Sequence, residues 1–415
     1  MNIYFPEHLV HLTERVQRCL LLANRYGFDI DNVRLSVSRQ PWFVVKNRDD
    51  VLSITTDLFE YVGGNHNHQA IDLFIRYRHD NANDIDKRIK TSVAINLFDN
   101  EKFYDTWSLP QSCNAIFNLT SLADSQAHFC WLITLLALDF LLEDAIVIAR
   151  GMDNVSRETW PIHIDDFPKV EVKDRKLTGW LPNCNHSDFL LIDAEKFRLY
   201  PVVDSVDWLE RCLKLGVKTV QLRIKNQHQS DLEAQIIEAV RLGNQYLVQV
   251  FINDYWQLAI KHHAYGVHLG QDDLNTTDLE QIQQAGIRLG VSTHGYFELL
   301  RSIQISPSYI ALGHIFPTST KQMPSKPQGL VRLGLYQQLV YSMMSSLNTP
   351  ERFVPTVAIG GIDLDNAAEV LRCGVNSIAV VRAMTQAKNC SSIVSQFEQI
   401  MDKDIVLQKE YCDAE

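Results

Sequence analysis

The chain has 415 residues, of which 46% are hydrophobic and 21% are charged, a balance typical of a globular protein with a large core. The formal net charge of −11, without any block of lysines or arginines, argues against a nucleic-acid or anionic-membrane partner. The cysteines occur singly, no signal-peptide pattern is present and the longest apolar run is too short for a bilayer, so we expect reduced thiols and a cytoplasmic location.

Residues 1–167 show the mixed pattern of a small α/β domain. Helical periodicity covers residues 9–26 and predicts one long helix over 125–152, while strand-like runs fall at residues 33–37, 42–45, 92–97 and 114–118. The segment 128–152 loosely resembles a late helix pair of ribokinase-type kinases, but the glycine-rich anion hole and catalytic aspartate expected before it are absent. We therefore expect a non-catalytic domain, followed over residues 168–190 by a linker of mixed charge.

Residues 191–405 alternate regularly between short apolar runs and amphipathic helical segments. The predicted strands are 199–203, 219–222, 247–252, 266–269, 287–291, 309–312, 356–359 and 377–381. The predicted helices are 206–215, 231–242, 256–264, 277–285, 297–303, 333–344, 364–373 and 393–401. This alternation predicts an α/β fold of the (β/α)8 TIM-barrel type, in which ligands bind at the carboxyl ends of the strands.

An aspartate follows each of two successive predicted strands, Asp254 after the third and Asp273 after the fourth. Mg²⁺ typically binds one or two carboxylates and completes its shell with phosphate oxygens and water, so this pair predicts a magnesium site. Asp254 could instead cap the helix that follows it. Asp273 has less reason to be a cap, because Thr277 and Glu280 already form a capping-box pattern for the next helix.

Other strand ends carry groups that suit phosphate. Side-chain alternation directs Gln221, Arg223 and Lys225 to the barrel mouth, where two cations and an amide could bind a diphosphate. Ser292 follows the fifth strand without the glycines of a nucleophile elbow, and a long loop follows the sixth. Gly361 ends the seventh strand, where backbone N–H groups of barrels commonly hold a phosphate. Together these groups predict a site for two phosphorylated substrates.

Seven motifs follow one another in this half of the chain. They are QLRIK (221–225), FINDYWQLA (251–259), GVHLGQDD (266–273), GVSTH (290–294), LGHIFPTSTK (312–321), PQG (327–329) and VAIGGI (357–362). In this order the motifs closely resemble thiamine phosphate synthase over residues 197–387. The resemblance implies a transferase that joins hydroxymethylpyrimidine diphosphate to a thiazole phosphate, through a pyrimidine carbocation, and yields thiamine phosphate and pyrophosphate.

The resemblance also implies a role for each matched residue. The pyrimidine diphosphate would be held by Gln221, Leu222, Arg223, Ile224, Lys225, Asn253 and Lys321, with Ser292 near the pyrimidine. The thiazole phosphate would be held by Thr318, Ser319, Thr320, Gly361, Val381 and Arg382. The expected catalytic residues are Arg223, Lys225, Ser292 and Lys321, and the expected ligands of one Mg²⁺ are Asp254 and Asp273. Arg382 departs from the family, which usually has a small hydroxyl residue at that position. Two arrangements are open: Arg382 contacts the phosphate directly, or it points away while Val381 and the backbone hold the ligand.

Two other functions are weighed against this one. A thiazole tautomerase shares the barrel, but it has no diphosphate leaving group that would need Arg223 and Lys225. A non-catalytic sensor of phosphate ligands is disfavoured by the intact aspartate pair. We expect two small-molecule substrates and no nucleic-acid or membrane partner, and the sequence leaves a homo-oligomer open.

Overall fold

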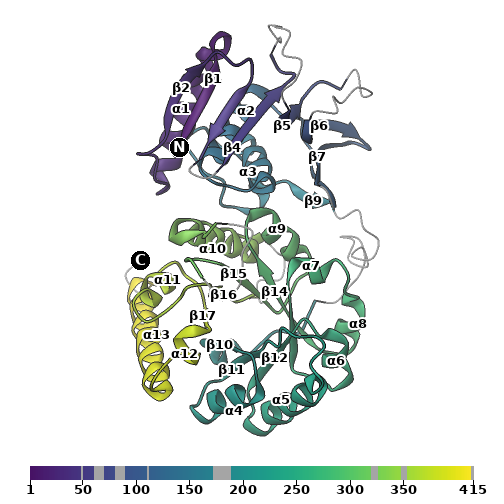
Figure 1. Ribbon diagram of the computed structural model, residues 1–415, viewed down its shortest axis with the longest axis vertical. Helices are drawn as coiled ribbons and strands as arrows, with labels where there is room; N and C mark the ends of the chain where they lie inside the picture. The colour runs from purple at the N-terminus through teal and green to yellow at the C-terminus, as the bar shows by residue number, and fades with distance from the viewer. Residues whose placement is uncertain are drawn as a thin grey trace. The chain divides into compact units, whose positions relative to one another are not determined.

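The computed structural model describes residues 1–47, 50–59, 70–79, 89–109, 112–171, 188–318, 326–346 and 353–412 (Figure 1). The chain divides into two compact units, Met1–Lys173 and Asp174–Glu415. Within the described ranges, no helix is long and apolar enough to cross a membrane.

The first unit contains a nine-stranded sheet whose strands run in the order β2-β1-β3-β4-β5-β6-β7-β8-β9. Its strands are β1 (Asn2–Pro6), β2 (Arg34–Ser38), β3 (Phe43–Lys46), β4 (Val51–Thr56), β5 (Ile71–Arg76), β6 (Ile89–Asp99), β7 (Lys102–Leu109), β8 (Ser112–Asn118) and β9 (Lys169–Glu171). The helices are η1 (Glu7–Leu12), α1 (Thr13–Arg25), α2 (Ser125–Ala137), α3 (Leu142–Asn154) and η2 (Ile164–Asp166). Helix α2 packs against α1, α3 and strands β1 and β3, so the expected α/β domain is confirmed.

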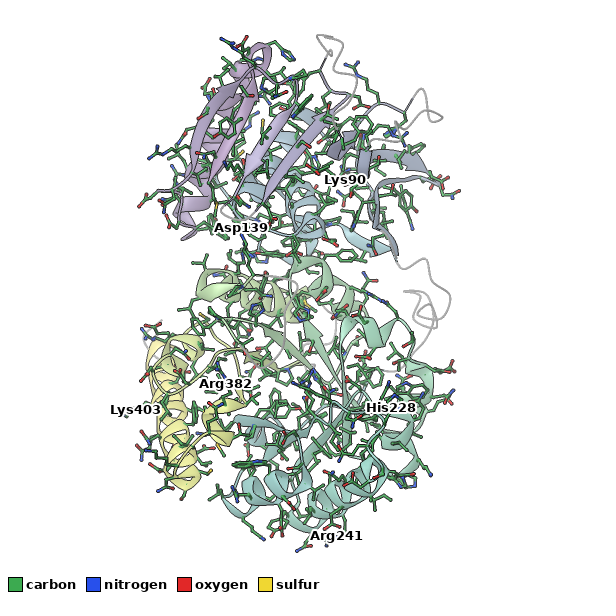
Figure 2. All side chains as sticks on the ribbon, viewed as in Figure 1. Lys90, Asp139, His228, Arg241, Arg382 and Lys403 are labelled. Atoms are coloured by element: carbon green, nitrogen blue, oxygen red, sulfur yellow. The ribbon has the colours of Figure 1, made fainter. Side chains whose placement is uncertain are left out.

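Several details of this unit differ from the sequence prediction. Strands β1, β4, β5 and β7 were not predicted, because their apolar residues alternate too weakly with polar ones to stand out. The single long helix is wrong, since α2 and α3 are separated at Asp139, which has a left-handed φ of 63° (Figure 2). Strand β9 lies within the segment predicted as a linker, where it pairs antiparallel with β8.

The helix layer of this unit covers several buried polar side chains. Arg150 donates two hydrogen bonds to Asp105, and both side chains are almost fully buried. The Tyr77 hydroxyl lies 2.7 Å from Nδ1 of His128, and burial lowers the pKa of His128 well below its usual range. A buried, hydrogen-bonded ion pair is costly to break, so this cluster ties α3 to β7.

The second unit is a closed barrel of eight parallel strands. Its strands are β10 (Leu199–Val203), β11 (Thr219–Leu222), β12 (Gln249–Asn253), β13 (Gly266–Leu269), β14 (Arg288–Thr293), β15 (Tyr309–Gly313), β16 (Thr356–Ile359) and β17 (Ser377–Val380). Each strand pairs with the next, and β17 closes the barrel on β10. The predicted (β/α)8 barrel is therefore confirmed, with strand ends within two residues of those expected.

The barrel helices lie outside the strands (Figure 1). They are α4 (Val206–Lys214), α5 (Leu232–Tyr246), α6 (Trp256–Lys261), α7 (Gln271–Leu274), α8 (Leu279–Gln284), α9 (Tyr296–Gln304), α10 (Gly329–Ser346), α11 (Ala367–Leu371), α12 (Arg382–Thr385) and α13 (Cys390–Cys412), with a turn of η4 (Ala194–Lys196) before β10. The short helices α7 and α12 were not predicted. The expected Thr277 cap is also wrong, because α8 starts at Leu279 and its N-cap is Asp278, which accepts from Gln281 N–H.

Aromatic side chains fill the barrel interior. Tyr200, Phe251 and Tyr309 belong to one buried cluster, and the ring centroids of Phe251 and Tyr309 lie 5.0 Å apart. The strands make room for them with glycine, since a Cβ on Gly266 would lie 2.3 Å from Phe251 and one on Gly290 would lie 2.2 Å from Tyr309. The aromatic layer thus forms a solid floor beneath the carboxyl ends of the strands.

Candidate active site

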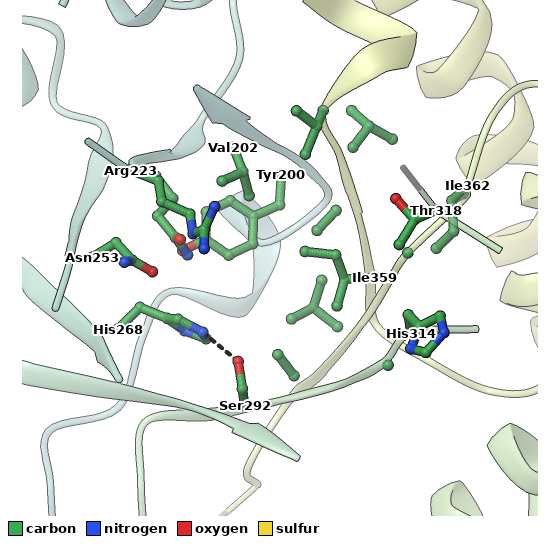
Figure 3. Close-up of a pocket in the computed structure, with 18 of the residues that line it drawn as sticks. Tyr200, Val202, Arg223, Asn253, His268, Ser292, His314, Thr318, Ile359 and Ile362 are labelled. Atoms are coloured by element: carbon green, nitrogen blue, oxygen red, sulfur yellow. Dashed lines mark hydrogen bonds between the residues drawn. The ribbon is translucent and has the colours of Figure 1, made fainter. Parts of the chain in front are cut away.

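A cavity of about 880 Å³ opens at the carboxyl ends of the barrel strands. All eight strands supply residues to its lining. In Figure 3, Tyr200, Arg223, Asn253, His268 and Ser292 lie on one side of this cavity, and His314, Thr318 and Ile362 lie on the other. Its volume is in the range of small-molecule sites, and it has two chemically different sides.

The end of β11 supplies the cationic side. Gln221, Arg223 and Lys225 all line the cavity, as their alternation predicts. Leu222 and Ile224 do not line it, because they point the other way and are buried. Their side chains therefore do not reach the cavity, and a substrate contact through their backbone stays a prediction. The Ile224 carbonyl instead accepts a hydrogen bond of 2.9 Å from the Tyr255 hydroxyl.

The two predicted metal ligands, Asp254 and Asp273, both line this cavity. Asp254 has a left-handed φ of 66°, which turns the chain sharply where β12 ends, and helix α6 has no side-chain cap. The N-cap position of α6 is occupied by Tyr255 and not by Asp254. Asp273 does have a local role, because its Oδ2 accepts from Gly270 N–H at 3.2 Å at the start of α7. The sequence analysis considered Asp273 only as a cap for the next helix, and it missed this hydrogen bond at the start of α7.

A chain of hydrogen bonds crosses the floor beneath the cavity. Gln221 Nε2 donates to the Tyr200 hydroxyl at 3.1 Å, and the hydroxyls of Tyr200 and Tyr309 lie 2.7 Å apart. His268 Nδ1 lies 2.7 Å from the Tyr309 hydroxyl, and its Nε2 lies 2.8 Å from Ser292 Oγ. Burial raises the pKa of Tyr200 and of Tyr309, so both remain protonated hydroxyls at neutral pH.

Residues of the other side come from the ends of β15, β16 and β17. Thr318, Gly361, Val381 and Arg382 all line the cavity, as predicted, with Arg382 exposed at the first position of α12 (Figure 2). Ser319, Thr320 and Lys321 lie outside the described residues. Two hydrogen bonds join the loop that follows β15 to the end of β16. Ile315 N–H donates to the Ile359 carbonyl, and Phe316 N–H donates to the Gly360 carbonyl.

Histidines near this side were not predicted. His314 is buried and lines the cavity, and its Nδ1 has no hydrogen-bond partner among the described residues. Burial, and secondarily the nearby His294, lower the pKa of His314, which favours a neutral imidazole. His294 itself pairs with Glu298 Oε2 at 2.8 Å. The missed floor residues Tyr200, His268 and Tyr309 could have been found as polar groups at inward positions of strands.

The charges around the cavity are unbalanced. Its described lining has six carboxylates against three lysine or arginine groups, namely Asp204, Asp254, Asp272, Asp273, Glu298 and Asp363 against Arg223, Lys225 and Arg382. A highly charged anion would be repelled by such a lining unless a cation accompanied it. No cluster of three or more His, Cys, Asp or Glu residues that could enclose a metal occurs in the part of the chain that is described.

Comparison with known proteins identifies the family. The family model described as thiamine monophosphate synthase matches residues 197–384. The thiamine-phosphate synthase of Salmonella schwarzengrund is 56% identical over 202 residues, which cover 49% of this chain and 90% of that protein. The chain belongs to the thiamine-phosphate synthase family. The synthase of Serratia proteamaculans is likewise 56% identical, over 50% of this chain and 92% of that protein, and that of Pectobacterium atrosepticum is 58% identical, over 47% and 86%.

Among solved structures, the thiamine phosphate pyrophosphorylase of Pyrococcus furiosus is 26% identical and covers 51% of this chain and 98% of that one, with a TM-score of 0.43. The family match falls entirely on the barrel, so we call the barrel the synthase unit. The first unit is a separate region outside this match.

Proposed function

We propose that the synthase unit condenses 4-amino-2-methyl-5-hydroxymethylpyrimidine diphosphate with 4-methyl-5-(2-hydroxyethyl)thiazole phosphate, giving thiamine phosphate and pyrophosphate. The observation that carries this proposal is the meeting of Arg223 and Lys225 with Asp254 and Asp273 in one cavity of the family's barrel. A tautomerase has no use for this combination, and a sensor has no need of a leaving-group site. The comparisons support the synthase and neither alternative.

The pyrimidine diphosphate would lie on the side of β11 and β12. Arg223 would bind phosphate oxygens through two N–H groups, Lys225 would add a point charge, and Asn253 would add an amide from the end of β12. Ser292 and Gln221 would lie beside the pyrimidine ring. Lys321, outside the described residues, keeps its predicted place with the diphosphate.

Asp254 and Asp273 would hold one Mg²⁺ together with the substrate. The carboxylate excess of the cavity suits a divalent cation, and a site of only two protein carboxylates suits Mg²⁺, which keeps phosphate and water ligands. When bound, the ion neutralises charge that develops on the leaving diphosphate. Asp273 can serve in this way while one of its oxygens still accepts from Gly270 N–H.

The thiazole phosphate would lie on the opposite side, against Thr318 and the Gly361 turn, with Val381 and Arg382 at its rim. Ser319 and Thr320, which lie outside the described residues, are proposed to contact the same phosphate. The two glycines of this turn have left-handed φ values of 104° and 68°, a conformation that brings backbone close to a ligand.

The reaction follows from this arrangement. The bond between the pyrimidine methylene and the diphosphate oxygen breaks, and the electron pair leaves with the diphosphate. Arg223, Lys225 and Lys321 would stabilise that charge, and the thiazole nitrogen then donates its electron pair to the methylene carbon. Holding both substrates in one enclosed cavity replaces a bimolecular encounter by an oriented one.

One assay tests the proposal. Both substrates are mixed with Mg²⁺ and the full-length protein, and pyrophosphate and thiamine phosphate are measured together. Equal, Mg²⁺-dependent amounts of the two products are expected. Binding without pyrophosphate would indicate a sensor, and isomerisation of the thiazole alone would indicate a tautomerase.

Two further properties belong to the same proposal. The described cysteines, Cys19, Cys130, Cys212, Cys373 and Cys390, are free thiols, which supports a reducing compartment and hence the cytoplasm. The ligands are two small molecules, and a homo-oligomer stays a prediction.

A further inference from the structure

Five polar side chains on five different strands form one hydrogen-bonded chain across the barrel floor. In order along the chain they are Gln221 on β11, Tyr200 on β10, Tyr309 on β15, His268 on β13 and Ser292 on β14. Both ends of the chain line the cavity, as do Tyr200 and His268 but not Tyr309, and Figure 3 shows His268 directed at Ser292. The proposed function gives the three middle members no part in holding a diphosphate or a metal, yet they are buried polar groups that cost stability unless each is satisfied.

The hydrogens of this chain can be assigned from its first member. Gln221 donates through Nε2, so the Tyr200 oxygen is an acceptor there and the Tyr200 hydrogen is directed to Tyr309. The Tyr309 hydrogen then has His268 Nδ1 as its acceptor. A neutral His268 with an unprotonated Nδ1 carries its proton on Nε2 and donates it to Ser292 Oγ.

The outcome at the two ends follows directly. The Ser292 oxygen already accepts from His268, so its own hydrogen is available to a ligand in the cavity. One of the two N–H groups of the Gln221 amide is engaged by Tyr200, which directs the amide nitrogen at the floor and leaves the carbonyl oxygen as an acceptor for a ligand. An imidazolium at His268 would donate from both nitrogens, and the Tyr309 hydrogen would then be left buried without an acceptor, at a cost in stability.

We propose that Tyr200, Tyr309 and His268 are positioning residues that orient the Gln221 carbonyl oxygen as an acceptor and the Ser292 hydroxyl as a donor toward the cavity, so that together they favour a 4-aminopyrimidine over its 4-oxo analogue. This inference rests on the proposed function, which places the pyrimidine between the two ends. A 4-aminopyrimidine offers an amine donor beside a ring-nitrogen acceptor, and so complements a carbonyl and a hydroxyl hydrogen. The 4-oxo tautomer offers the opposite pair.

The chain has one other consistent arrangement, in which every hydrogen points the other way. Gln221 would then accept from Tyr200, His268 would donate from Nδ1 to Tyr309, and Ser292 would donate to His268 Nε2. The two ends would now present a donor at Gln221 and an acceptor at Ser292, which complements the 4-oxo ring. The donor and acceptor roles of Gln221 and Ser292 reverse together. The three middle residues therefore couple the ligand contact of Gln221 to that of Ser292.

The test compares two pyrimidine diphosphates, the 4-amino substrate and its 4-oxo analogue, in the full-length protein. Tyr309→Phe removes the central hydroxyl and keeps the ring that packs beneath the cavity. Its expected effect is a fall of about tenfold or more in the ratio of kcat/KM for the amino over the oxo compound. Tyr265→Phe is the matched control, because its hydroxyl also bonds to a glutamine, Gln249, within the barrel but does not line the cavity. It should leave the ratio unchanged.

An unchanged ratio in a folded Tyr309→Phe variant, or an equal fall in Tyr265→Phe, would overturn the proposal. A second measurement needs no variant of Tyr309 and no turnover. The ¹⁵N shifts of His268 in the wild-type protein, assigned by their loss in His268→Gln, should show a neutral ring protonated at Nε2. A ring protonated at Nδ1, or at both nitrogens, would overturn it. Absence of pyrophosphate release from the amino substrate would instead refute the proposed function, and the histidine spectrum would still report the direction of the chain.

Discussion

At the scale of single residues, Asp254 and Asp273 illustrate how a carboxylate can serve structure and chemistry together. Asp273 accepts from Gly270 N–H through one oxygen, whereas Asp254 takes a left-handed backbone conformation just before Tyr255, the N-cap residue of α6. A left-handed aspartate is uncommon outside turns, so this position has a conformational cost that a ligand role would explain.

Changing Asp254 or Asp273 to Asn should lower turnover by about 100-fold, because each change removes one charge from a site that has only two metal-binding carboxylates. Pyrophosphate release measured against Mg²⁺ concentration checks this, and excess Mg²⁺ or Mn²⁺ should restore part of the rate. Asp278→Asn is the control, since Asn caps α8 as well as Asp does. Near-normal turnover in both active-site variants would show that the two aspartates have a structural role and do not bind the metal.

Arg382 lies at the cavity rim, where the family usually has a small residue. Replacing it with Ser should raise the KM for thiazole phosphate about tenfold, because a charge-assisted hydrogen bond to phosphate contributes about 1.5–3 kcal/mol. The KM for the pyrimidine diphosphate should change much less. Steady-state kinetics with each substrate varied in turn measures both constants, and Lys388→Ser, an exposed change outside the cavity, is the control. An unchanged thiazole constant would mean that Arg382 faces solvent.

At the scale of elements, the turn after β16 is fitted tightly against the loop after β15. Gly361 has a φ of 68°, and a Cβ there would lie 2.7 Å from Phe316 Cβ and from the Pro317 carbonyl. Gly286 has nearly the same φ, 69°, but open space around it. Substituting each glycine with alanine therefore separates two costs to stability. Gly286 reports the cost of the left-handed backbone alone, and Gly361 adds the cost of the steric clash.

Gly286→Ala should lower the free energy of unfolding by about 1–2 kcal/mol, the cost of a left-handed alanine. Gly361→Ala should cost about 1–3 kcal/mol more, because the added methyl group displaces the Phe316–Pro317 segment. It should also raise the KM for thiazole phosphate, whereas Gly286→Ala should not. Chemical denaturation and kinetics on both variants measure these differences, and equal effects would show that the turn is not tightly packed.

At the scale of the whole molecule, the two units are separate in sequence similarity and in internal packing. The first unit has its own core, in which Phe43 packs against Phe5 of β1 and Phe129 of α2, and its own buried Asp105–Arg150 pair. The barrel strands, the cavity and every described residue of the proposed site belong to the second unit.

A protein of residues 188–415 should therefore retain turnover per folded molecule within about twofold of the full chain, because every described residue of the proposed site belongs to the second unit. Circular dichroism establishes the folded fraction, and pyrophosphate release gives the rate. Reduced solubility alone would agree with this expectation. A folded barrel that binds both substrates but releases no pyrophosphate would assign the first unit a direct part in catalysis.

The sequence by itself determined the barrel, the order of its strand-end motifs and the family. These depend on short-range information, because a buried parallel strand is a continuous apolar run and its end is marked by the polar residues that follow. The alternation of side chains along the same strand end also predicted that Gln221, Arg223 and Lys225 face the cavity. Only the structure showed that Leu222 and Ile224 are buried.

Only the tertiary structure brought together Tyr200, Tyr309 and His268. They come from strands β10, β15 and β13, and the two tyrosines are 109 positions apart in the chain. In the sequence each is a single polar residue in an apolar run. Closure of the barrel places the Tyr309 hydroxyl 2.7 Å from the Tyr200 hydroxyl and 2.7 Å from His268 Nδ1. The absence of side chains at Gly266 and Gly290 leaves the space in which the aromatic rings of the floor pack.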